Sequence, residues 1–210
     1  PAQEKRRGGV NPILLLAIAA LWLYVLGVFR RAELYAWRFL WGSMGLFILL
    51  MAGVRPWLTR PLARYVCAMA GVIGRLSGTF TAYFKYGILY IPVEESSITL
   101  QVDFECSGVI EIMAFLSLLA FFNVYRTSEK VLVGLMGFAY IMVCNALRIA
   151  IICLSVHLLG MDAYYVMHTF VGRIVFYLFS VWLYFYVFTK PQVVQMKVGR
   201  FSYELPKNNS

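Results

Sequence analysis

The sequence predicts an all-α integral membrane protein, with about six transmembrane helices and a small β-hairpin outside the membrane. Of its 210 residues, 61% are hydrophobic and 14% are charged, a composition too apolar for a soluble domain of this length. Several apolar runs approach the roughly 20 residues that a helix needs to cross a bilayer. One segment between them alternates apolar and polar residues, as a half-buried strand does.

We expect residues 1–210 to form a single membrane domain. Its strongly apolar spans are 12–29, 34–54, 108–124, 131–154 and 166–188. A further span, 62–84, is weaker because Arg64 and Arg75 interrupt it. By itself, this segment also fits an amphipathic helix that lies in the membrane interface.

The excess of basic residues orients the chain. Lys and Arg outnumber Asp and Glu by 19 to 10, and loops rich in basic residues stay in the cytoplasm. Basic residues gather at both termini and in the connections 55–64 and 126–130. No basic stripe interleaved with aromatic residues occurs, which argues against nucleic-acid binding.

The acidic connections face the other way. Residues 94–105 carry four acidic and no basic side chains, and 158–165 carry Asp162 alone, so both belong outside the cytoplasm. These assignments require 62–84 to cross the membrane and leave both termini cytoplasmic. Arg30 and Arg31 are an exception, because they then fall in a short outer turn.

A strand pattern follows the third span. Residues 98–104 alternate between apolar and polar side chains, a period of two. Residues 87–91 can pair with them across a turn at 92–97. We therefore predict an outer hairpin over about 86–104.

Three reactive side chains reach the same predicted depth. At a rise of about 1.5 Å per residue, Cys106, Arg148 and His168 lie roughly 24, 25 and 30 Å above the inner ends of their helices. A thiol reacts as its thiolate, which a neighbouring cation favours. Arg can hold a thiolate or a developing oxyanion, and His can protonate a leaving amine.

Each of these residues also has a structural interpretation. Cys106 alone would be read as an inert buried thiol, although its neighbours Ser107 and Gly108 are not those of a core cysteine. Arg148 can snorkel to the interface, but Asn145 lies one turn away on the same helix face. His168 alone fits an interfacial histidine. Spacing leaves both interpretations open.

The remaining cysteines indicate no cofactor. Cys67, Cys144 and Cys153 show neither CxxC spacing nor clustered histidines, so the sequence predicts no metal site, no disulfide framework and no organic cofactor.

Three short blocks resemble those of the exosortase/archaeosortase family, and in particular its compact branch found in Gram-positive bacteria. They are Glu105-Cys106-Ser107-Gly108, Asn145-Ala146-Leu147-Arg148 and the block that begins with His168-Thr169-Phe170. They occur in the family's order, within residues 94–188. The resemblance implies that Cys106 is the nucleophile, Arg148 its thiolate or oxyanion partner, and His168 the acid and base.

The same resemblance implies a sortase-like cysteine transpeptidase. Such an enzyme cleaves a C-terminal sorting signal on a membrane-anchored protein outside the membrane and passes the acyl group to a lipid or cell-envelope acceptor. Some members carry Arg in place of the third-block His, which gives Arg173 a smaller claim.

Two further residues are candidates near the site. Glu111 lies about one and a half turns beyond Cys106 and is a possible ion-pair partner of Arg148. His157 is a second outer-facing histidine and an alternative base.

Other functions stay open on the sequence alone. Water as acceptor would make the protein a hydrolytic intramembrane cysteine protease. A non-catalytic membrane component of export or polysaccharide assembly would tolerate Cys106→Ala. A lipid S-acyltransferase lacks support, because its Asp-His-His-Cys type of motif is not present.

Overall fold

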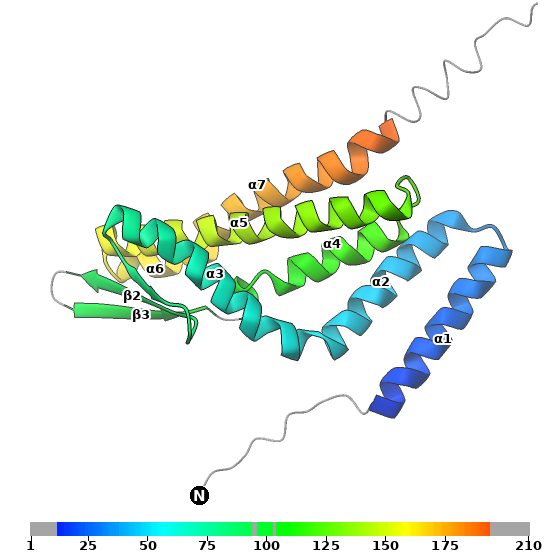
Figure 1. Cartoon of the computed structure of the whole chain (residues 1–210), viewed down its shortest axis with the longest axis horizontal. Helices are drawn as coiled ribbons and strands as arrows, with labels where there is room; N and C mark the ends of the chain where they lie inside the picture. Colours follow the sequence, from blue (N-terminus) through cyan, green and yellow to red (C-terminus); the bar gives the residue numbers. More distant parts are fainter. Residues whose placement is uncertain (1–11, 94–95, 103, 194–210) are drawn as a thin grey trace, which may run out of the picture.

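The computed structural model describes residues 12–93, 96–102 and 104–193, which form a helical bundle with a small sheet at one end (Figure 1). The helices are α1 (Pro12–Arg31), α2 (Tyr35–Gly53), α3 (Arg55–Ser77), α4 (Val109–Phe121), α5 (Thr127–Leu159), α6 (Asp162–Val166) and α7 (Gly172–Tyr184). Short helical turns are η1 (Phe104–Cys106), η2 (Met167–Val171) and η3 (Phe185–Thr189), and the strands are β1 (Thr81–Tyr83), β2 (Ile88–Val93) and β3 (Ser96–Gln101).

The helices confirm the predicted fold class. Four helical segments of the described chain are long and apolar enough to cross a membrane, namely Ile13–Arg31, Tyr35–Gly53, Thr127–Leu159 and Tyr164–Val193. Helix α4 is apolar but has only 13 residues, and α3 is not among the four. The protein is therefore a multi-pass helical membrane protein.

The predicted span 62–84 differs from the helix that the chain forms there. Helix α3 begins at Arg55 and ends at Ser77, because Gly78 takes a left-handed conformation with φ 68° that stops a helix. Thr81–Tyr83 then form a strand instead of the end of a helix. The apolar residues after Gly78 were thus assigned to the wrong element.

The predicted hairpin is confirmed and gains a strand. The sheet is antiparallel in the order β1-β2-β3, and β2 pairs with β3 from Ile88↔Gln101 to Val93↔Ser96. One face of β2 carries Leu89 and Ile91, both fully buried against the helices. The alternation in the sequence thus marks a sheet that covers one end of the core.

One end of the bundle collects basic residues. The ring of Phe122, at the end of α4, lies 6.4 Å from that of Phe39 at the start of α2 and 5.0 Å from that of Phe188. The turn between α1 and α2 lies at this same end (Figure 1). Arg30 and Arg31 therefore lie at the same end of the bundle as Arg126 and Lys130, and not at the opposite end, where the expected order of crossings placed them.

The start of α3 lies toward the opposite end. The Arg55 guanidinium stacks 3.7 Å from the centroid of the Phe104 ring, two residues before Cys106. This contact disagrees with an order of crossings in which residues 55–64 and Cys106 lie on opposite faces. Loop charges could not reveal this contact, because assigning faces from them assumed that every apolar segment crosses the membrane.

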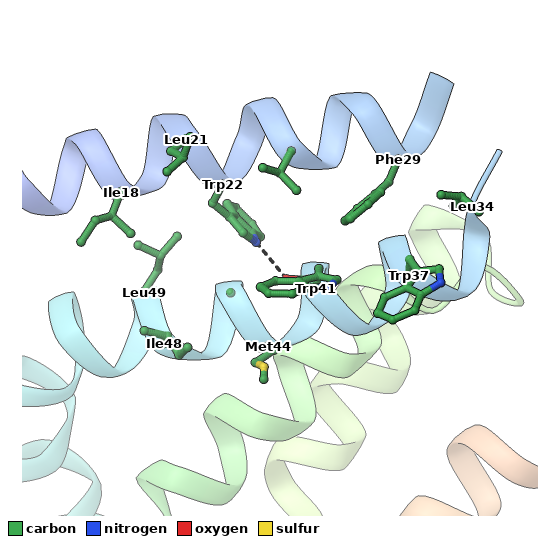
Figure 2. Close-up of a pocket in the computed structure, with 12 residues that line it drawn as sticks. Ile18, Leu21, Trp22, Phe29, Leu34, Trp37, Trp41, Met44, Ile48 and Leu49 are labelled. Carbon is green, nitrogen blue, oxygen red and sulfur yellow. Dashed lines mark hydrogen bonds between the residues drawn. The ribbon is translucent and has the colours of Figure 1, made fainter. Parts of the chain in front are cut away.

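Helix α1 packs mainly on α2. The Trp22 indole N–H donates to the Trp41 carbonyl over 2.9 Å, and an apolar groove of about 610 Å³ runs between the two helices (Figure 2). Most side chains of α1 point away from the protein. In a membrane they face lipid, so their exposure is compatible with a stable bundle.

The close contact between α4 and α5 requires a glycine at position 137. A Cβ at Gly137 would collide with the Phe115 ring, whereas a Cβ at Gly134 would meet only Leu119 and Leu116 at 3.5 and 3.7 Å.

We expect Gly137→Ala to destabilise the protein by about 1–3 kcal/mol through overpacking. Gly134→Ala is the matched control on the same helix, and its higher helix propensity should keep or raise stability. Thermal unfolding in detergent measures both, and equal melting temperatures would contradict this packing.

Candidate active site

Cys106 lies in a tight turn between the sheet and α4. Ser107 closes the turn, because its backbone N–H and its hydroxyl both donate to the Phe104 carbonyl, over 3.3 and 2.7 Å. Gly108 follows with φ 76°, a left-handed conformation that side chains with a Cβ disfavour. The Cys-Ser-Gly string thus folds into a turn that holds the thiol at the start of α4.

Asn145 anchors this turn to α5. Its side-chain amide donates to the Cys106 carbonyl over 2.5 Å, and the residue is fully buried. A Cβ at Gly108 would lie 3.2 Å from the same amide nitrogen, so glycine leaves room for this bond. The hydrogen bond and the glycine together fix where Cys106 lies along α5.

Arg148 lies one turn further along α5 and points to the thiol. Its Nη2 donates toward Cys106 Sγ over 3.9 Å, and the side chain is 4% exposed. The guanidinium also lies 5.7 Å from the Phe176 ring centroid. Its Nε has no hydrogen-bond partner among the described residues, so a donor remains for a bound group.

His168 approaches the thiol from the third helix. Its Nε2 lies 3.3 Å from Cys106 Sγ. The residue sits in η2, a π-helical turn, and such turns often occur at functional sites because they displace a side chain from regular helical positions. The thiol therefore lies between an imidazole and a guanidinium, in contact with both.

A small pocket opens beside the sulfur. It measures about 30 Å³, and its walls include Cys106, His168, Tyr164, Ile152 and Leu100. This volume is comparable to that of one water molecule. The reacting group of a substrate therefore fits here only if the walls separate slightly.

Glu111 does not form the predicted ion pair. Its Oε2 has no hydrogen-bond partner in the described part of the chain, and the Arg148 guanidinium contacts Cys106 instead. The Arg148 charge still acts on the Glu111 carboxylate through space. Glu111 thus belongs to the surroundings of the site and not to the contacts of the thiol.

Two of the other candidates have different surroundings. His157 hydrogen-bonds through Nδ1 to the Pro92 carbonyl over 2.7 Å, so it ties α5 to β2 and does not serve as the partner of Cys106. Arg173 is exposed at the start of α7. No group of three or more His, Cys, Asp or Glu in the described residues is arranged to hold a metal ion.

Sequence reasoning missed two neighbours of the site. Tyr164 was explained as part of an aromatic belt and not as a site residue, yet its ring lies 5.4 Å from the His168 ring, centroid to centroid, and lines the pocket. The spacing of four residues was the available signal, since it places both side chains on one helix face. Arg55 on Phe104 gave no such signal, because the two residues are far apart in sequence.

The Asn145 bond gives a prediction about stability. Asn145→Ala leaves the buried Cys106 carbonyl without its donor, so we expect a loss of about 1–3 kcal/mol and a lower melting temperature. Ser117→Ala is the matched control: the Ser117 hydroxyl donates to Met113 in its own helix, and that carbonyl keeps its helical bond. If both variants have the same melting temperature, the Asn145 hydrogen bond does not hold the turn.

Comparison with known proteins identifies a family for the chain. A family model described as transmembrane exosortase matches residues 7–186, which include the turn, Arg148 and His168. No curated protein and no solved structure was found to match the chain. Family members are membrane-embedded, sortase-like transpeptidases. The chain therefore belongs to the transmembrane exosortase family.

Proposed function

We propose that this protein is a cysteine transpeptidase that cleaves a C-terminal sorting signal and transfers the new acyl group to an acceptor. One observation carries the proposal, namely that Cys106 Sγ lies 3.3 Å from His168 Nε2 and 3.9 Å from Arg148 Nη2. A thiol between a base and a fixed cation has what nucleophilic catalysis requires.

In the first half-reaction, the Cys106 thiolate attacks the carbonyl carbon of the scissile peptide bond. The C–S bond forms, the carbonyl electrons move to oxygen, and the Arg148 guanidinium stabilises the resulting oxyanion. When the C–N bond breaks, His168 gives its proton to the departing amine. A thioester on Cys106 and a free C-terminal fragment result.

In the second half-reaction, an acceptor nucleophile attacks the thioester. His168, now neutral, takes the acceptor's proton, and Cys106 leaves as the thiolate that Arg148 stabilises. Cys106 is only 8% exposed and the adjoining pocket is of the size of one water. An acceptor therefore reaches the thioester only when the pocket walls separate, and the choice of transfer over hydrolysis rests on the family.

We infer the orientation from four basic residues, Arg30, Arg31, Arg126 and Lys130, which lie at one end of the bundle. The positive-inside rule applied to them assigns this end to the cytoplasm, whereas Arg55 and Arg60, at the start of α3, lie toward the other end. The site then lies toward the outer face, where it meets a membrane-anchored substrate and a lipid or cell-envelope acceptor. The end of α7 is cytoplasmic, whereas the start of α1 lies on the outer side, unlike our expectation from loop charges.

Thiol reactivity tests this assignment. We expect iodoacetamide to alkylate Cys106, with a rate that rises with pH as the thiolate forms. Arg148→Gln should move the midpoint of that rise to higher pH and slow alkylation at pH 7 by about tenfold, because a cation that favours the thiolate is lost. Cys106→Ser supplies the background from the other cysteines.

His168→Gln should also change the profile, since it removes the other group at the sulfur. His157→Gln is the matched control, because His157 binds the Pro92 carbonyl and not the thiol. If neither Arg148→Gln nor His168→Gln changes the alkylation rate of Cys106, the catalytic assignment is refuted.

A further inference from the structure

Strand β3 forms an edge of the sheet. In the described part of the chain, β2 is its neighbour on one side and no strand pairs on the other. The bond between the Val102 N–H and the Gly87 carbonyl, 2.9 Å long, shows which residues of β3 direct their backbone N–H and C=O groups toward β2. This bond continues the β2–β3 register, so residues at every second position bond to β2.

The intervening residues must therefore point their backbone groups away from β2. These are Ser97, Thr99 and Gln101, whose partners across the ladder are Pro92, Tyr90 and Ile88. Pro92 agrees with this parity, since it has no N–H and its carbonyl accepts from His157 instead of from β3. Within the described residues, no hydrogen bond outside the ladder uses the backbone of these three positions.

The edge leads directly to the nucleophile. Leu100 and Gln101 at the end of β3, with Val102 directly after it, line the same pocket as Cys106 and His168, together with Leu89 of β2. The opposite wall comes from Tyr164 and α5. The end of the β3 edge and the Cys106 thiol therefore border the same pocket, which places a chain added along β3 next to the nucleophile.

From this shared pocket, we propose that the β3 edge binds an extended segment of the peptide substrate as an added strand and delivers the scissile carbonyl to Cys106. This rests on the proposed function. Recognition through the backbone fits an unfolded peptide, because its N–H and C=O groups match those of Thr99 and Gln101. A lipid chain offers no such ladder of donors and acceptors.

A proline at Thr99 separates edge binding from folding. Thr99 points its N–H outward, so Thr99→Pro removes a donor from the open edge but none from the β2–β3 ladder, and edge strands tolerate proline in this orientation. Thr99→Val keeps the N–H and is the matched control. Both variants should alkylate with iodoacetamide as the parent does, which shows that the turn and its thiol are intact.

The probe is a capped octapeptide of alternating threonine and valine with a cysteine at one end, activated as a thiopyridyl disulfide. Cys106 thiolate attacks the peptide sulfur and releases the thiopyridine, whose absorbance gives the rate. A capped, activated single cysteine is the reference, and Cys106→Ser gives the background. Peptides with the cysteine at either end are compared, because a strand can add in either direction.

We expect at least one octapeptide to react about tenfold faster than the single cysteine, and Thr99→Pro but not Thr99→Val to abolish this gain. N-methylation of alternate amides adds a second test. Only one edge of the peptide can face β3. Methylation of the alternate amides that face β3 should therefore abolish the gain in rate, and methylation of the other alternate amides should retain it.

The proposal is overturned if neither octapeptide gains over the single cysteine, if Thr99→Pro keeps the full gain, or if both methylation parities behave alike. Such outcomes leave the proposed function standing, provided that the alkylation rate still depends on Arg148 and His168. If alkylation ignores those residues, the proposed function fails by itself, whatever the octapeptides do.

Discussion

The hydrogen bond from the Asn145 side chain to the Cys106 carbonyl connects the reactive turn to the longest helix of the bundle. Both groups are buried, and an unpaired polar group in such an interior is costly. The turn therefore has one favourable position along α5, and that position places the thiol next to Arg148, one helical turn away. Gly108 makes the close approach possible, because its backbone is left-handed and it has no Cβ facing the amide.

The other elements complete this arrangement. Helix α7 and its π-helical turn deliver His168, while the sheet places the edge of β3 beside the same pocket. The helices thus supply the reacting groups and the sheet supplies a backbone surface. His157 joins these two parts through the Pro92 carbonyl, which explains why a second histidine lies near the site without contacting the sulfur.

Much of this was accessible from the sequence, for identifiable reasons. Long apolar runs and the period-two segment predicted the helices and the hairpin, and family-like blocks selected Cys106, Arg148 and His168. Depth along a helix cannot give lateral distance, so their contact required the structure. Two predictions differed from the structure, at Gly78 and at Arg55. The left-handed Gly78 ends α3 earlier than the apolar pattern indicated. Arg55 stacks on Phe104, so the connection that begins at Arg55 lies on the side of the site, whereas loop charges had assigned it to the opposite, cytoplasmic side.

The central claim is that Cys106 carries an acyl group during turnover. Mass spectrometry of the Cys106 peptide, from protein isolated out of its own cell membrane with and without neutral hydroxylamine, tests this most directly. We expect a mass addition on Cys106 that hydroxylamine removes, as a thioester requires, and that is lost in Arg148→Gln. A wild-type protein in which Cys106 is found only as the free thiol, with an acyl adduct on another residue, would contradict it.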